Sequence, residues 1–195
     1  MMRRRLETGF SPFEEKQIYP VQETDSPKAV RGTQSYSLYR AMHKGGVVEL
    51  SSGKTKEQVI KQVIQKTAPK IGFDPEVVTE LLLDREELMT TAVNQGIAIP
   101  HPRDSILETP GSDLIITAFL NSPIDYGALD GKPVHTLFFL FSSTDKTHLH
   151  LLSKLAHFSS QENVLSYLTQ RPKFEDYLSF VKEWESSLLT TTRGT

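Results

Sequence analysis

Two spacings of apolar residues alternate along this chain from about residue 37 onwards. Short β-branched and apolar runs bounded by turn residues predict strands over 47–50, 93–99, 114–120 and 134–141. Apolar residues that repeat three and four apart predict helices over 39–44, 56–68, 75–88, 145–158, 161–169 and 173–187. Thr55 with Gln58, and Asp74 before Pro75, are the capping signals of the second and third helices. The alternation predicts one α/β domain over residues 36–188, with a mixed, mostly parallel central sheet flanked by helices.

Arg85 lies on the predicted apolar face of the helix over 75–88. That face is formed by Val78, Leu81, Leu82 and Leu88. An arginine that leans inward needs an anionic partner, because burying an unpaired charge is costly. In the alternative interpretation, its stem packs on the protein while the guanidinium reaches the surface. The sequence leaves both interpretations open.

His101 stands at the end of the predicted strand over 93–99, between Pro100 and Pro102. A proline fixes its own φ and keeps the preceding residue out of the helical region. We therefore expect the His101 imidazole to leave the strand end in a narrow range of directions. Sites in α/β sheets lie beyond strand ends, where His101 is placed. Alternatively, the strand ends at a proline turn whose histidine is incidental.

The helix over 145–158 contains two histidines that face different ways. His148 precedes by three or more residues the apolar face formed by Leu151, Leu152, Leu155 and Phe158, so we expect it to point towards the core. His150 shares its face with Lys146, Ser153, Lys154 and His157, so we expect it to point to water. Residues two apart on a helix diverge by about 200°, and the pair is therefore not expected to bind a metal ion.

Composition excludes several classes of protein. The chain has 195 residues, a net charge of -2 and no cysteine. Without cysteine there is no disulfide framework, thiolate zinc site or thiol nucleophile. The charge gives no basic field for binding nucleic acid, and no apolar run approaches the roughly 18 residues that span a membrane. The arginines near the start are not followed by an apolar core, so we expect a soluble, cytoplasmic protein without a signal peptide.

The two ends of the chain have no apolar periodicity. Residues 1–35 combine three prolines with charges of both signs, which predicts a flexible or surface-draped arm. Its arginine triplet could contact an acidic partner, although a solvated terminus is the simpler interpretation. Residues 189–195 are expected to form a frayed tail.

If Arg85, His101 and His148 converge, they combine a nucleophilic imidazole, a cation and a second imidazole. Such a set suits phosphoryl transfer, which needs in-line positioning and donors for the phosphoryl oxygens. The chain has no Walker or Rossmann phosphate loop, so we do not expect the phosphoryl donor to be a nucleotide bound to this chain. It also has no Gly-x-Ser-x-Gly elbow and no carboxylate pair suited to glycoside hydrolysis.

Three motifs carry a resemblance to a known family. They are Gly96-Ile97-Ala98-Ile99-Pro100-His101, the earlier Asp84-Arg85-Glu86, and the later Lys146-Thr147-His148-Leu149-His150-Leu151-Leu152-Ser153. In this order and spacing, over about residues 47–180, they resemble the EIIA domain of the fructose/mannitol type of the bacterial phosphotransferase system, above all its nitrogen-regulatory branch. The resemblance implies that His101 accepts a phosphoryl group from the phosphohistidine of an HPr-like carrier, with Arg85 and His148 as active-site partners. It implies no cofactor and no metal.

The chain departs from the family pattern at two positions. Asn94 and Pro102 stand where the family usually has Gly or Ala. Asparagine tolerates unusual backbone angles, so Asn94 is a mild change. Pro102 removes a backbone N–H that could face the phosphoryl group and stiffens His101, which puts the rate of transfer and the choice of partner in question.

The resemblance leaves several functions to distinguish. The sequence contains no recognisable EIIB domain or membrane span, which favours a nitrogen-type regulator that reports its phosphorylation state to a target protein. One alternative is a sugar-specific EIIA that passes the phosphoryl group to a separate EIIB. Another is a docking regulator that no longer turns over phosphate. A nucleic-acid regulator that uses the arginine-rich start has no support from net charge or motifs.

Overall fold

The computed structural model describes residues 36–51 and 53–191. The arm predicted over residues 1–35 lies outside the described residues. The predicted tail overlaps the last helix, which continues to Thr191, and residues 192–195 also lie outside.

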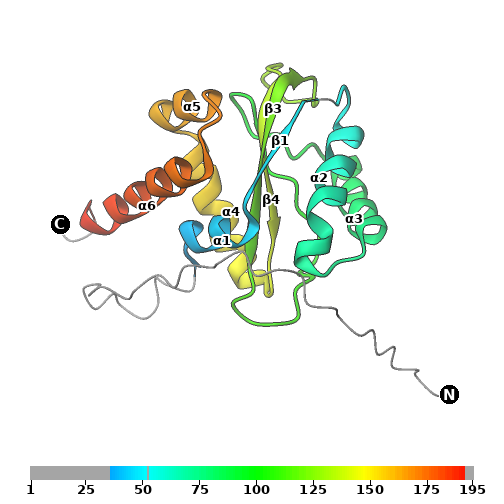
Figure 1. Ribbon diagram of the computed structural model, residues 1–195, viewed down its shortest axis with the longest axis horizontal. Coiled ribbons are helices and arrows are strands. Elements are labelled where there is room, and N and C mark those ends of the chain that lie inside the picture. The colour runs from blue at the N-terminus through cyan, green and yellow to red at the C-terminus, as the bar shows by residue number, and fades with distance from the viewer. Residues whose placement is uncertain (1–35, 52, 192–195) are drawn as a thin grey trace, which may run out of the picture. The chain divides into compact units, whose positions relative to one another are not determined.

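A four-stranded mixed sheet forms the centre of the described domain (Figure 1). Its strands are β1 (Val47–Leu50), β2 (Ile97–Ala98), β3 (Leu114–Ile124) and β4 (Val134–Phe141). They lie in the order β1-β3-β4-β2. β1 pairs with β3 in parallel and β2 pairs with β4 in parallel, whereas β3 and β4 are antiparallel, with Ile115 opposite Leu140. The predicted mixed, mostly parallel sheet is confirmed.

Helices cover both faces of this sheet (Figure 1). On one face lie α2 (Lys56–Ile71) and α3 (Pro75–Leu88). On the other lie α1 (Leu38–Gly45), α4 (Asp145–Ser159), α5 (Glu162–Thr169) and α6 (Phe174–Thr191). Alternating residues of each strand supply the two cores: Ile116 and Phe139 pack towards α2 and α3, and Ile115 and Phe138 pack towards the other helices. This period of two is what an extended strand imposes.

The predicted capping residues begin their helices as expected. Thr55 accepts a hydrogen bond from the Gln58 N–H at 3.3 Å, and Asp74 accepts from the N–H groups of Glu76 and Val77. Thr144 does the same for α4, accepting from the Thr147 N–H at 3.1 Å. These bonds satisfy donors that the first helical turn leaves without a partner.

The strand predicted over 93–99 is wrong in length, because β2 contains only two residues. Before it the chain turns sharply: the Val93 N–H donates to the Ile97 carbonyl, and Gln95 and Gly96 have φ values of 58° and 83°. A Cβ on Gly96 would also lie 2.5 Å from Cδ2 of His135. Glycine is therefore required at this turn by both backbone angle and space.

The predicted apolar face of α3 is right for Val78 and Leu82 but wrong for Leu81 and Leu88. The residues that it buries are Val78, Leu82 and Glu86, whereas Leu81 and Leu88 are 37% and 63% exposed. The contact with α2 and the sheet is centred on a row of residues four apart, which rotates the helix away from the predicted face. Arg85 lies half-buried at the border of this contact, and Glu86 points inward instead.

Candidate functional site

His101 lies just beyond the end of β2 and is held in one orientation. The Pro100 carbonyl before it accepts from the Leu140 N–H of β4 at 3.0 Å. Its ring Nδ1 lies 2.7 Å from the Ile99 carbonyl oxygen. Because a carbonyl only accepts, Nδ1 carries the hydrogen, and the lone pair of the neutral ring is on Nε2. Pro102, which has no N–H, follows it and is buried.

The surroundings of His101 keep its imidazole neutral. The residue is only 8% exposed, and this burial lowers its pKa to about 4, although the hydrogen bond to Ile99 acts in the opposite direction. Repulsion from the Arg85 guanidinium, and from His148 whenever that ring is protonated, lowers the pKa further. Near pH 7 the ring is therefore an uncharged imidazole with an available lone pair, which is the form that acts as a nucleophile.

His148 projects from the first turn of α4 towards His101. The two ring centroids are 5.1 Å apart, at an interplanar angle of 55°. Burial also lowers the pKa of His148, opposed by the nearby Asp145 carboxylate. His150 is exposed and stacks against Tyr36 instead, at 4.2 Å between centroids. The predicted choice of His148 as the inward histidine is confirmed.

Arg85 contributes the cation of this cluster from the end of α3. Its guanidinium donates to the Met89 carbonyl at 2.9 Å, and its charge lowers the pKa of both His101 and His148. The structure thus places His101 against His148, with Arg85 near enough for its charge to act on both rings. The anionic partner that an inward Arg85 would need is not seen among its contacts in the described part of the chain, which agrees with its position at the border of the core.

Two serines behind His148 were not predicted. Ser142, at the end of β4, has its Oγ 3.2 Å from His148 Nδ1 and 3.4 Å from Ser105 Oγ. Ser105 in turn donates to the Asp145 carboxylate at 3.1 Å. No local pattern singles out these serines, because only the folded sheet brings residue 105 next to residue 142.

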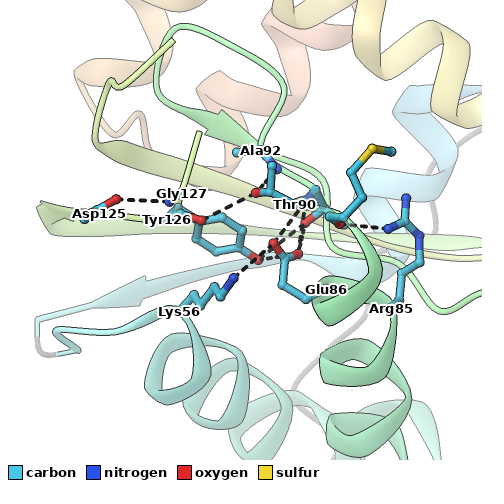
Figure 2. A network of polar contacts seen from close by, with 10 residues as sticks. Lys56, Arg85, Glu86, Thr90, Ala92, Asp125, Tyr126 and Gly127 are labelled. Carbon is cyan, nitrogen blue, oxygen red and sulfur yellow. Dashed lines mark hydrogen bonds and ion pairs between the residues drawn. The ribbon is translucent and has the colours of Figure 1, made fainter. Parts of the chain in front are cut away.

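Glu86, the neighbour of Arg85 on α3, is a buried carboxylate (Figure 2). It is 3% exposed and accepts hydrogen bonds from the N–H and hydroxyl of Thr91 and from the Tyr126 hydroxyl at 3.3 Å. The Lys56 ammonium lies 3.7 Å away. Burial and the Glu86 charge raise the pKa of Tyr126, so its hydroxyl stays protonated and donates. The sequence feature that could have indicated this burial is the spacing: Glu86 follows Val78 and Leu82 at intervals of four residues, on the same side of the helix.

The fold and this cluster define a class of phosphoryl-transfer component: a neutral histidine at a strand end, flanked by a second imidazole and a guanidinium. A family model confirms the class. The model of the phosphoenolpyruvate-dependent sugar phosphotransferase system, EIIA 2, matches residues 42–184. The chain belongs to this family.

Individual relatives include nitrogen regulatory proteins and a fructose-specific component. A nitrogen regulatory protein of Pseudomonas aeruginosa is 35% identical over 126 residues, which cover 63% of this chain and 80% of the relative. The fructose-specific EIIABC component of Bacillus subtilis is 28% identical over 67% of this chain but only 20% of its own length. The solved structure of nitrogen regulatory protein IIA-Ntr from Neisseria meningitidis superposes with a TM-score of 0.62 at 26% identity, over 71% of this chain and 93% of that one.

None of the helices described between residues 36 and 191 is sufficiently long and apolar to span a membrane.

Proposed function

We propose that His101 is a phosphoryl acceptor that takes its phosphoryl group from the phosphohistidine of an HPr-like carrier, with Arg85 and His148 binding the group during transfer. The observation that carries this proposal is the hydrogen bond from His101 Nδ1 to the Ile99 carbonyl. It leaves the lone pair on Nε2, and burial keeps that lone pair free of a proton. The acceptor atom is therefore Nε2.

In the proposed step, the Nε2 lone pair attacks phosphorus in line with the N–P bond of the donor. The Nε2–P bond forms as the donor bond breaks, and the bonding pair returns to the donor ring nitrogen. The His101 ring becomes positively charged, and its Nδ1–H donates to Ile99 throughout, which stabilises that charge. Arg85 offsets the negative charge of the phosphoryl oxygens.

His148 supplies a second donor in this proposal. That role needs hydrogen on Nε2 of His148, and therefore a lone pair on Nδ1. The Ser142 hydroxyl, 3.2 Å from Nδ1, can donate to it and fix this tautomer. Since the pKa of His148 is lowered, its ring is a neutral donor and leaves Arg85 as the cation of the cluster.

We assign the carrier to nitrogen-type regulation in the cytoplasm, with a downstream regulatory target protein. The 35% identity to a nitrogen regulatory protein and the superposition on a second one support this assignment. The second candidate is sugar transport through a separate EIIB, which the likeness to a fructose-specific component favours. Incubating the phosphorylated protein with a purified fructose-type EIIB separates the two, because only a sugar-specific EIIA should transfer its phosphoryl group to it rapidly.

The first test is phosphorylation in a reconstituted chain. The purified protein is incubated with phosphoenolpyruvate, the upstream kinase and an HPr-like carrier, and is followed by intact mass. One acid-labile phosphoryl group should appear and should be lost in His101→Asn, whose amide can still donate to the Ile99 carbonyl. No adduct in the presence of an active carrier would contradict phosphoryl transfer and would favour the docking regulator.

A further inference from the structure

The carboxylate of Glu86 occupies a place where an apolar side chain would ordinarily stand. It continues the buried row of Val78 and Leu82, and its side chain is almost completely shielded from water. Replacing such a buried ionic group by a well-packed apolar one is often neutral or stabilising. The bonds that Glu86 makes therefore need a reason beyond the stability of the core.

These bonds lead directly to the phosphorylation site. The Thr91 N–H donates to both Glu86 oxygens, at 3.0 and 3.1 Å. The carbonyl of the same residue accepts from the Ile99 N–H at 2.9 Å. The Ile99 carbonyl accepts from His101 Nδ1 at 2.7 Å. Three successive hydrogen bonds thus connect the Glu86 carboxylate to the His101 imidazole.

Glu86 also fixes the segment against which Arg85 rests. Arg85, its neighbour on α3, donates to the Met89 carbonyl, and Glu86 binds Thr91 two residues further on. Figure 2 shows the two side chains leaving the helix on either side of this segment. Consecutive residues of one helix therefore bind both ends of the segment over residues 89–91.

We propose that Glu86 is a positioning residue for phosphoryl transfer. Through Thr91 and Ile99 it fixes the orientation of the His101 ring relative to the Arg85 guanidinium. This inference rests on the proposed phosphorylation of His101. Glu86 touches neither His101 nor the transferred group. Its role is to keep one ring orientation, and hence one acceptor nitrogen, in the free protein.

Tyr126 provides a matched control within the same network. Its hydroxyl donates to the same carboxylate at 3.3 Å, but it lies outside the chain of bonds that leads to His101. Glu86→Gln keeps the size of the side chain but removes its charge. It also replaces one accepting oxygen by an NH2 group, which cannot accept a hydrogen bond from Thr91. Tyr126→Phe removes one bond to Glu86 and a 3.4 Å contact with the Thr91 hydroxyl, and leaves the three hydrogen bonds that lead to His101 intact.

The experiment compares both variants with wild type at a temperature where each is fully folded. Two quantities are measured: the rate constant of phosphoryl transfer from the HPr-like carrier, and the ¹⁵N signals of the His101 ring without any phosphoryl donor. Glu86→Gln should slow transfer at least tenfold relative to Tyr126→Phe, and should convert the single Nδ1–H form of His101 into a mixture of two tautomers. Rates within twofold of each other and an unchanged ring signal would overturn the proposal.

Glu86→Asp keeps the proposal testable if Glu86→Gln does not fold. It keeps the negative charge but withdraws the carboxylate from the Thr91 N–H by one methylene group, and should slow transfer about threefold with partial loss of the single tautomer. A rate and ring signal equal to those of Tyr126→Phe would count against the proposal. The ring signal is independent of the reaction, so failure of wild type to accept a phosphoryl group would contradict the proposed function alone.

Discussion

Lowering the pH should destabilise this protein through His101. Burial holds the pKa of the folded-state imidazole at about 4, whereas a histidine in an unfolded chain has a pKa of about 6.5. Between these two values the unfolded chain binds more protons than the folded protein. The contribution of His101 to the free energy of unfolding is therefore fully present above about pH 6.5 and is lost as the pH decreases towards about 4.

The size of this loss follows from the two pKa values. Between about pH 7.5 and about pH 5, they integrate to a loss of about 2 kcal/mol from His101 alone. Burial also lowers the pKa of His135 and His148, and both act in the same direction. His101→Asn removes only the first contribution, because an amide can donate to Ile99 but does not titrate.

Urea unfolding at the two pH values measures this contribution. Wild type should lose about 2 kcal/mol more free energy of unfolding than His101→Asn over this interval, since the contributions of the other histidines cancel in the comparison. Equal losses in the two proteins would refute the reasoning, because they would mean that His101 has an ordinary pKa in the folded state.

Three further substitutions, one of them with a matched control, test other parts of the account. Arg85→Gln should slow phosphoryl transfer by about a hundredfold or more, measured by the rate of mass increase, and should raise the pKa of His101 in an NMR titration because a nearby positive charge is removed. Ser142→Ala should cost only about 1 kcal/mol in urea unfolding, but should leave His148 in mixed tautomers by ¹⁵N NMR; a single tautomer would contradict the assigned hydrogen bond. Gly96→Ala should lower the free energy of unfolding by about 3 kcal/mol, because alanine is strained in the left-handed backbone conformation and its Cβ overpacks the site. Gly111→Ala, with a φ of 80° and open space around the added Cβ, should cost about half as much by the same assay, and equal costs would show that the close contact is unimportant.

The parts of the fold that the sequence predicts are those encoded by local patterns. Thr55 and Asp74 begin their helices because a short side chain can reach the next free N–H groups wherever the helix packs. The runs over 114–120 and 134–141 are short, almost continuously apolar and rich in β-branched and aromatic residues, which favours a buried strand over a helix. Over 93–99, by contrast, the turn at Gln95 and Gly96 outweighs the apolar run and leaves a strand of two residues.

The residues of the site also differ in how far the sequence predicts them. His101 between two prolines and His148 ahead of an apolar face are visible in the sequence, because each is defined by its near neighbours. The orientation of α3 depends on which of its rows meets the sheet, so the sequence leaves the direction of Arg85 open and gives no sign that Glu86 is buried. Ser142 was missed because its contact with His148 forms only once β4 and α4 are packed.

The most direct test of the central claim is to locate the transferred phosphorus atom. Protein labelled with ¹⁵N histidine and phosphorylated by the HPr-like carrier is examined by NMR for coupling between ³¹P and ring nitrogen. The account predicts one coupling, to Nε2 of His101, with the hydrogen still on Nδ1. Coupling to Nδ1, to another histidine or to none in a reaction with an active carrier would contradict it.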